Sequence, residues 1–424
     1  MVRIIYSLLF YLLMPFVLLR LLWRSRREPR YRQNLAQRFG FISFVPSASP
    51  LIWVHAVSAG ETIAAVPLIR NLLAGGYRIV LTAMTPTGRE RAEALLGDSV
   101  IHCYAPFDLP GAVKRFIKNT GPRCLVIIDT ELWPNTIHQC ALNNIKTILV
   151  NGRLSARSAN GYGKIPWLVR PMLNEMDYLA VQTKAHGERF IQLGLAREKL
   201  LVAGSIKFDH QLPEDFDSRV TLLRNKIGQR FVIIAASTHA GEEEMILKAL
   251  ADLQRQNREL LLVLAPRHSH RCDEVSALVG QVFSGKTALV KHSDGIKCDS
   301  DTIVLLLDTM GELIYFYGVS DIAIVGGSLV PVGGHNLMEA AEAGVPIIMG
   351  HHLENIDDIA SMFRDNDAMK VVHDAAELKL ELGALVQSSQ QRDQLSAMAT
   401  KVLLANQGAL AKVERLITEL LGRE

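Results

Sequence analysis

The chain has 424 residues, of which 49% are hydrophobic and 21% charged, and its formal net charge is +3. This length and composition predict two or three folded domains and exclude a largely disordered chain. Residues 1–40 carry eight arginines and one acid, so the remainder is mildly acidic, which argues against a nucleic-acid-binding protein. The five cysteines form no C-x-x-C pair, so neither a disulfide framework nor a structural zinc site is expected.

The first predicted element is an apolar helix at the amino terminus, because residues 4–19 are almost wholly apolar. Five arginines follow it: Arg24, Arg26, Arg27, Arg30 and Arg32. About 20 residues are enough to cross a ~30 Å hydrocarbon core, and the positive-inside rule keeps the arginines in the cytoplasm. Pro15 and Arg20 interrupt the run, so a helix that lies in the membrane interface is the alternative to a spanning anchor. We therefore interpret residues 1–40 as a membrane anchor with a basic segment.

Short apolar runs then alternate with segments of helix length. The runs expected to be strands in the first half are Leu51–His55, Arg78–Thr82, Val100–Tyr104, Cys124–Asp129, Thr147–Val150, Tyr178–Gln182 and Leu201–Ala203. Those in the second half are Phe231–Ala235, Leu260–Ala265, Ile303–Leu306, Ile322–Val325 and Pro346–Met349. The alternation predicts two α/β domains, each with a parallel sheet covered on both faces. We assign residues 41–208 to the first domain, 209–220 to a linker, and 221–424, with leucine-rich C-terminal helices, to the second.

Three polar side chains follow predicted strands of the first domain. Glu61 lies three residues after Ser58, a spacing that fits a capping box and equally a general base whose ionised form the helix N-terminus favours. Glu131 follows the fourth strand, where a plain helix start is the alternative, and Lys207 follows the last. Because ligands of such sheets bind at the carboxyl ends of the strands, all three are candidates for one cleft.

The second domain contains features that suit a nucleotide. Arg267 follows a predicted strand and can form a fork of hydrogen bonds to phosphate. Two glycine pairs precede Asn336, where a helix start offers N–H groups to phosphate, and Glu339 can reach a ribose hydroxyl. His268 and His270 form an H-x-H pair without a visible third ligand, so a metal site there is not favoured.

Several familiar motifs are absent from the sequence. It has no G-x-x-x-x-G-K-[ST] phosphate loop, no G-x-G-x-x-G after the first strand and no G-x-S-x-G nucleophile elbow. These absences argue against a phosphate-loop nucleotidase, a nicotinamide enzyme and a serine hydrolase. The D-x-D pattern of Asp299 and Asp301 lies in a polar stretch rather than at an apolar strand end, so we interpret both as solvated acids.

Seven short motifs follow one another along the chain: Ser58-Ala-Gly-Glu61, Thr130-Glu-Leu-Trp-Pro-Asn135, Asn151-Gly-Arg153, Gly204-Ser-Ile-Lys207, Ala265-Pro-Arg-His268, Met310-Gly-Glu312 and Gly333-Gly-His-Asn-Leu-Met-Glu-Ala340. None is specific alone. Jointly and in this order they closely resemble the 3-deoxy-D-manno-octulosonic acid (Kdo) transferase family. The resemblance runs from the apolar N-terminal helix to the C-terminal helices.

The resemblance implies a GT-B fold, in which two Rossmann-like domains face an interdomain cleft. It also implies an inverting, metal-independent glycosyltransferase without a cofactor, at the cytoplasmic face of the inner membrane. The donor would be CMP-Kdo and the acceptor the tetraacylated lipid A precursor of lipopolysaccharide synthesis. By motif, Glu61 would be the catalytic base, and Glu131 and Lys207 would support the transition state. The CMP site would comprise Pro266, Arg267, Met310, Gly311, Glu312, Asn336, Leu337, Met338 and Glu339.

Two other classes of protein share parts of this pattern. A nucleotide-sugar 2-epimerase has the same two-half architecture, but it needs neither a lipid acceptor nor the N-terminal apolar helix. A non-catalytic, membrane-tethered nucleotide-sugar-binding protein is the third interpretation. It leaves the convergence of Glu61, Glu131 and Lys207 on one cleft unexplained.

Overall fold

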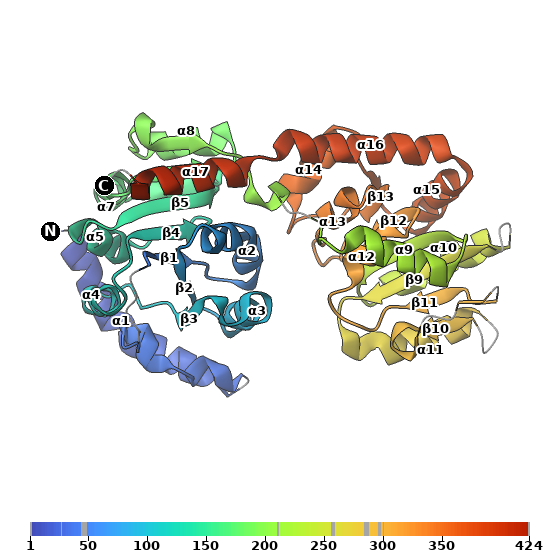
Figure 1. The fold of residues 1–424 in the computed structure, drawn as a ribbon, viewed down its shortest axis with the longest axis horizontal. Coiled ribbons are helices and arrows are strands. Elements are labelled where there is room, and N and C mark those ends of the chain that lie inside the picture. The colour runs from blue at the N-terminus through green and yellow to red at the C-terminus, as the bar shows by residue number, and fades with distance from the viewer. Residues whose placement is uncertain are drawn as a thin grey trace. The chain divides into compact units, whose positions relative to one another are not determined.

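The structure is a computed structural model that describes residues 2–26, 28–43, 49–209, 212–255, 259–283, 288–295, 298–299 and 301–422. Arg27 and residues 210–211 of the predicted linker lie outside these ranges. The chain forms two compact units, residues 1–210 with 406–424 (unit 1) and residues 211–405 (unit 2). Each contains a seven-stranded parallel sheet between helices (Figure 1).

The sheet of unit 1 has the strand order β3-β2-β1-β4-β5-β6-β7. Its strands are β1 Leu51–His55, β2 Arg78–Ala83, β3 Ile101–Tyr104, β4 Cys124–Ile128, β5 Lys146–Gly152, β6 Tyr178–Val181 and β7 Leu200–Val202. Its helices are α1 Val2–Arg24, α2 Ala59–Ala74, α3 Pro86–Leu96, α4 Pro110–Thr120, α5 Pro134–Leu142, α6 Ala156–Gly163, α7 Pro166–Glu175, α8 Lys184–Gln192 and α17 Ala409–Gly422. The strand order reverses between β1 and β4, so the loops after these strands diverge and leave room for a ligand.

The sheet of unit 2 has the order β10-β11-β9-β8-β12-β13-β14, which reverses between β8 and β12. Its strands are β8 Phe231–Thr238, β9 Leu260–Pro266, β10 Leu289–Lys291, β11 Val304–Leu306, β12 Ile322–Val325, β13 Ile347–Gly350 and β14 Lys370–Val372. Its helices are α9 Phe216–Ile227, α10 Glu242–Gln254, α11 Cys272–Val282, α12 Leu313–Gly318, α13 Met338–Glu342, α14 Asp357–Asp365, α15 Ala375–Gln387 and α16 Ser389–Asn406.

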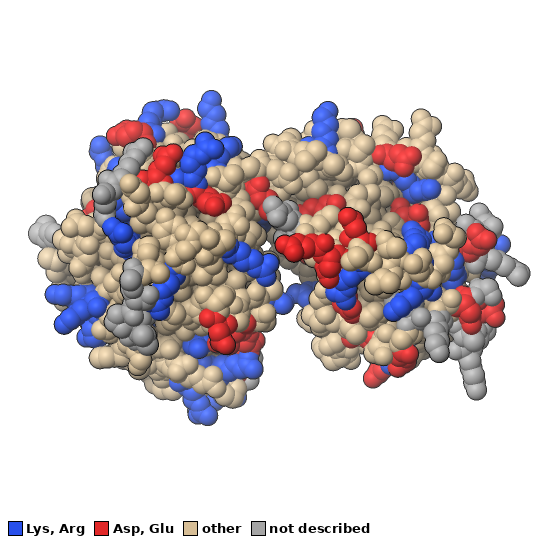
Figure 2. All heavy atoms as spheres, viewed as in Figure 1, with Lys and Arg blue, Asp and Glu red and all other residues tan. Residues whose placement is uncertain are grey.

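The predicted fold class is confirmed, because all the expected strands form and all pair in parallel. Their apolar side chains fill the cores of the two units, as the fully buried strands β1 and β4 illustrate. The sequence analysis missed β10 and β14, which are edge strands of three residues each. On the face seen in Figure 2, acidic and basic side chains are interspersed on each unit.

The last helix belongs to unit 1, whereas we had assigned the whole C-terminal segment to the second domain. Val413 and Ile417 lie on an apolar stripe of α17 and are buried in the core of unit 1. The carboxylate of Asp209 accepts hydrogen bonds from the amides of Gly408 at 2.5 Å and Leu410 at 2.7 Å. Asp209 therefore caps the start of this helix, and α17 returns the chain to unit 1.

Helix α1 packs one face on unit 1 and exposes the other. Met14 is buried against Phe107 and the start of α4, and Tyr6 donates a hydrogen bond to Asp108 at 2.9 Å. The opposite face exposes large apolar side chains: Ile4, Ile5, Leu8, Leu9, Leu12, Leu13, Phe16, Leu19 and Leu22. Among the described residues, this is the one helix long and apolar enough to cross a membrane.

Candidate active site

The site in unit 1 is built where the strand order reverses, since Glu61 follows β1 and Glu131 follows β4. Glu61 lies in the first turn of α2 and is half-buried. Its Oε2 accepts the amide of Val57 at 2.7 Å, and its Oε1 accepts the hydroxyl of Ser58 at 2.9 Å. The Ser58 oxygen in turn accepts the amide of Glu61, so the capping interaction predicted from the spacing is present.

The capping hydrogen bonds do not use all the acceptor sites of the Glu61 carboxylate. Two carboxylate oxygens offer about four acceptor sites, and the hydrogen bonds from Val57 and Ser58 occupy two of them. Burial raises the pKa of Glu61 above its ordinary value, against the lowering effect of these two hydrogen bonds. A carboxylate with spare acceptor capacity and a raised pKa is suited to proton abstraction, so the capping role and the base role are compatible.

Glu131 lies beside Glu61 in the loop between β4 and α5. Burial, and then the negative charge of Glu61, raise the pKa of Glu131 to about 7. The indole N–H of Trp133 donates to its Oε2 at 3.0 Å. Two neighbouring carboxyl groups with different pKa values are a common arrangement for acid and base roles.

Asn151, at the end of β5, brings Lys207 to the same edge of the sheet. Its amide nitrogen donates to Asp129 at 2.5 Å, and its Oδ1 accepts the Ser205 hydroxyl at 3.1 Å and the Ile206 amide at 3.3 Å. Lys207 is the next residue, in a short 3-10 helix that contacts α2, the helix of Glu61. The structure thus gathers the three predicted catalytic residues in unit 1.

Asn151 belongs to the Asn-Gly-Arg motif, but the sequence pattern alone predicts no role for it. The available signal is the Asn-Gly pair at a strand end, since Asn151 has a φ of 61° and Asn tolerates this left-handed conformation better than most residues. Asp129, its hydrogen-bond partner, also has a positive φ of 57°. Both residues turn the chain sharply where the strands end, which aims the following loops at the site.

Glu131 makes the stability of the protein depend on pH. The pKa of Glu131 is about 7 in the folded state, against about 4.3 in an unfolded chain. The folded protein therefore binds the proton of this carboxyl group more tightly than the unfolded chain does. The stabilisation is complete below about pH 4 and is lost as the pH rises to about 7. Glu131→Gln should therefore flatten the decrease in urea midpoint between pH 4.5 and 7. The control Glu198→Gln, at an exposed position, should show the same decrease in urea midpoint as the wild type. If the urea midpoint of Glu131→Gln decreases with pH as steeply as that of the wild type, the pKa of Glu131 is not raised.

The site in unit 2 lies at the carboxyl ends of β8, β9 and β12. Arg267 directly follows β9, is exposed, and its amide donates to the carbonyl of Thr238 at 3.0 Å. His239 follows β8, and its Nε2 lies 2.8 Å from Nε2 of His335 in the glycine loop. Burial, and then the nearby His239 and Arg267, lower the pKa of His335 to about 4. The His239–His335 pair beside an exposed guanidinium can donate hydrogen bonds to an anion.

His239 and His335 were not predicted as site residues. Each is a single histidine after a strand or in a glycine loop, and no spacing in the sequence pairs them. The rings of His239 and His335 stack with centroids 5.0 Å apart, and His268 packs edge-on against His239. His268 was weighed as a metal ligand with His270. No group of three or more metal-ligating side chains is present among the described residues.

A carboxylate of the protein itself accepts hydrogen bonds from amides of the predicted glycine loop. The buried Glu242 accepts the amides of Gly327 at 2.8 Å, Ser328 at 3.0 Å and Leu329 at 2.9 Å. These three amides are therefore bonded to a protein carboxylate and are not available to a phosphate. The loop is instead fixed by Glu242, the first residue of α10.

The remaining residues of the predicted CMP site differ in which of their groups, side chain or backbone, could contact a ligand. The side chain of Asn336 accepts a hydrogen bond from the Met338 amide at 3.2 Å and donates one to Glu339 at 3.3 Å, so it is held against the start of α13. The side chains of Leu337 and Met338 are buried, and only their backbone could face a ligand. Pro266 ends β9 and is half-buried.

The turn after β11 supplies the last group of predicted residues. Glu312 is half-buried. Its carboxylate accepts hydrogen bonds from the Arg219 guanidinium at 3.0 Å and from the Thr309 hydroxyl at 2.6 Å. These bonds fix the turn, in which Met310 is 67% exposed and Gly311 has a φ of 86°. The exposed Met310 is thus available to pack on a ligand.

The sequence of the chain is similar to those of known proteins. The family model "3-Deoxy-D-manno-octulosonic-acid transferase (kdotransferase)" matches residues 33–210. The 3-deoxy-D-manno-octulosonic acid transferase of Haemophilus influenzae is 40% identical over 426 residues and 99% of both chains. That of Bordetella pertussis is 37% identical and covers 84% of this chain and 85% of its own length.

Solved structures show the fold at larger evolutionary distance. The UDP-GlcNAc 2-epimerase from Neisseria meningitidis aligns over 88% of this chain and 100% of its own, with a TM-score of 0.58 and 13% identity. At that identity the likeness concerns the two-domain GT-B-like architecture alone. Because the relatives of higher identity over nearly the whole chain are Kdo transferases, the chain belongs to the Kdo transferase family and is a glycosyltransferase that transfers Kdo.

Proposed function

We propose that the enzyme transfers Kdo from CMP-Kdo to the acylated lipid A precursor lipid IVA, with inversion and without a metal ion. Kdo transfer is a step of lipopolysaccharide synthesis. The observation that carries the proposal is that Glu61 and Glu131 lie together where the strand order of unit 1 reverses, while the segment of Lys207 contacts the helix of Glu61. A nucleotide-binding protein without catalytic activity would not need these groups. The epimerase alternative is supported only by a distant likeness of fold.

The reaction follows from the chemistry of these groups. Glu61 removes the proton of an acceptor sugar hydroxyl, whose oxygen then attacks the anomeric carbon of Kdo. The bond between that carbon and the CMP phosphate oxygen breaks, and CMP leaves with the electron pair. Arg267 and the His239–His335 pair stabilise the charge that develops on the phosphate. Lys207 supplies a positive charge for the Kdo carboxylate or the phosphate.

Helix α1 is proposed to hold unit 1 at the cytoplasmic face of the inner membrane. The sequence favoured a spanning anchor, but contacts with unit 1 extend from Tyr6 to Leu21 and occupy one side of the helix. The other side exposes the apolar face described above, in which Leu12 is 71% exposed. A helix with one protein-facing and one apolar side fits the membrane interface better than a span surrounded by lipid.

The proposed function is tested by incubating the enzyme in detergent with CMP-Kdo and lipid IVA, with and without chelator. We expect a Kdo-lipid product at nearly the same rate in both samples. If CMP-Kdo is consumed without a lipid product, the acceptor is wrong. A rate that collapses with chelator and returns with magnesium would contradict the metal-independent reaction.

Removal of the Arg267 guanidinium should weaken donor binding. Arg267→Ala is expected to reduce the affinity for CMP by about 1.5–3 kcal/mol, the usual contribution of a hydrogen bond to a charged group. Calorimetric titration with CMP measures this loss. Arg364→Ala, at the far end of α14, is the matched control and should bind CMP normally. Normal CMP affinity in Arg267→Ala would remove Arg267 from the donor site.

A further inference from the structure

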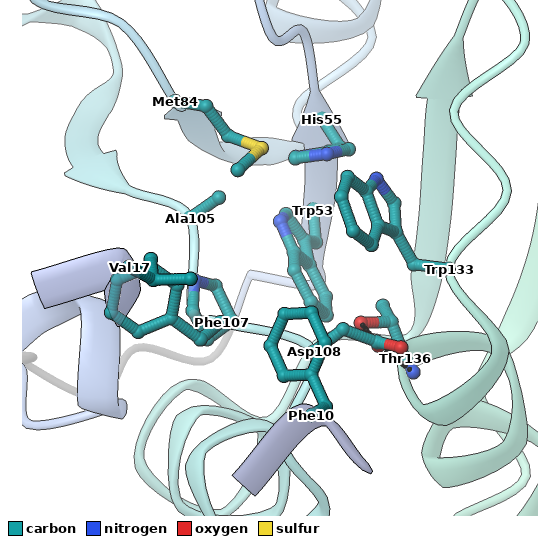
Figure 3. Close-up of a pocket in the computed structure, with 11 residues that line it drawn as sticks. Phe10, Val17, Trp53, His55, Met84, Ala105, Phe107, Asp108, Trp133 and Thr136 are labelled. Atoms are coloured by element: carbon teal, nitrogen blue, oxygen red, sulfur yellow. Dashed lines mark hydrogen bonds between the residues drawn. The ribbon is translucent and has the colours of Figure 1, made fainter. Parts of the chain in front are cut away.

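A cavity of about 100 Å³ lies in unit 1 between helix α1 and the carboxyl ends of the central strands. Phe10 and Val17 of α1 form one wall, and Trp53 of β1 forms another (Figure 3). Met84, Ala105 and Phe107, from the loops after β2 and β3, close the sides. Every one of these six side chains presents carbon, sulfur or an aromatic ring.

The polar groups in the cavity wall are already bonded to protein partners. The Trp53 indole donates to the Thr82 hydroxyl at 2.8 Å, and the Thr136 hydroxyl donates to Asp108 at 2.7 Å. His55 is uncharged at neutral pH, because burial lowers its pKa to about 4. A sugar or a phosphate would therefore find few hydrogen-bond partners, whereas cavities of this kind stay dry and accept apolar ligands.

The cavity lies between two functional surfaces of unit 1. Helix α1 forms its wall with Phe10 and Val17 and exposes Leu12 and Phe16 on the other side. Trp133 lines the cavity, and its indole N–H is bonded to Glu131 at 3.0 Å. One indole ring therefore separates the cavity from the candidate catalytic carboxylates, and one helix separates it from the apolar surface assigned to the membrane.

We propose that this cavity binds the end of an acyl chain of the acceptor lipid. The inference rests on the proposed function, in which the acceptor is acylated. An apolar cavity of about 150 Å³ holds benzene, so 100 Å³ corresponds to roughly four chain carbons. Each buried methylene group contributes about a fourfold gain in affinity. A chain held behind Trp133 fixes how far the acceptor sugar lies from Glu61 and Glu131.

Two substitutions fill the cavity without touching the proposed catalytic groups. Ala105→Leu fills it from the β3 side, and Val17→Phe fills it from α1. Leu380→Phe adds the same aromatic ring to an exposed position of α15 in unit 2 and is the matched control. We expect the KM for the acylated acceptor to rise by about 16- to 250-fold in both filled variants, because two to four methylene groups each lose a fourfold gain, with the KM for a fully deacylated acceptor unchanged. The control should match the wild type for both acceptors.

A second measurement does not depend on transfer. In a background of Trp23→Phe and Trp167→Phe, the remaining tryptophans are Trp53 and Trp133, which both line the cavity. A twelve-carbon fatty acid brominated at its end should quench their fluorescence, and Ala105→Leu or Val17→Phe should abolish the quenching. A melting curve identifies a filled variant that does not fold, and the other variant then decides the outcome.

The outcomes separate this inference from the proposed function. Saturable quenching that the filled variants lose supports the cavity, even if lipid IVA proves not to be the acceptor. Quenching that persists in a folded, filled variant overturns the acyl-chain site. A KM for the acylated acceptor that stays at the wild-type value in both filled variants also overturns it, even when Kdo transfer to that acceptor is intact.

Discussion

Glu61→Gln is expected to lower the turnover number by about 10²–10⁴-fold, the usual effect of losing a general base. Glutamine keeps the shape of the side chain and one carbonyl oxygen, but it cannot take up a proton. The carbonyl can still accept the amide of Val57, and the Ser58 hydroxyl can rotate to accept from the new NH₂ group. The melting temperature should therefore change little. Turnover is measured with saturating CMP-Kdo and acceptor, and CMP affinity should stay normal because Arg267 and the histidine pair belong to unit 2.

Ser58→Ala separates catalysis from capping. This change removes the side chain that caps α2 but leaves the Glu61 carboxylate in place. Loss of such a cap costs about 1 kcal/mol of stability, and turnover should fall only a few-fold. If Ser58→Ala is as inactive as Glu61→Gln, the geometry of the helix start matters more than proton transfer. An active Glu61→Gln enzyme would make Glu131 the next candidate for the base.

The central strands were predictable because burial on both faces leaves a strong local signal. In β4, for example, Cys124–Ile128 is an unbroken apolar run that ends at Asp129, and all five residues are buried. The missed edge strand β14 has only three residues, two of them partly exposed. The placement of α17 was wrong for another reason. An apolar stripe such as that of Val413 and Ile417 shows that a helix is buried, but not against which sheet.

The site was predictable where chemistry follows a strand and unpredictable where it depends on contacts. Glu61 and Glu131 were predicted because each is an acid in the loop or helix start that follows an apolar strand. The effect of Glu61 on the pKa of Glu131 arises only when β1 and β4 pair. The histidine pair of unit 2 and the capture of the glycine-loop amides by Glu242 join residues 85 or more positions apart. No local pattern encodes such contacts.

The sequence analysis also gave no role to Asp108, which holds α1, the loop after β3 and the start of α5 together. Its Oδ1 accepts the Thr136 amide and hydroxyl, both at 2.7 Å. Its Oδ2 accepts the Asn135 amide at 3.0 Å and the Tyr6 hydroxyl at 2.9 Å. Because Asp108 is 3% exposed, water cannot replace these bonds without opening the structure.

Asp108→Ala should therefore lower the free energy of unfolding of unit 1 by about 3–5 kcal/mol, since it leaves two buried amides without acceptors. Urea titration in detergent, followed by tryptophan fluorescence, measures the loss. Tyr6→Phe is the matched control, because it removes only the bond between α1 and Asp108 and should cost about 1–2 kcal/mol. If Tyr6→Phe is as destabilising as Asp108→Ala, the attachment of α1 contributes the stability. If Asp108→Ala unfolds at the wild-type urea concentration, the buried carboxylate does not hold these elements together.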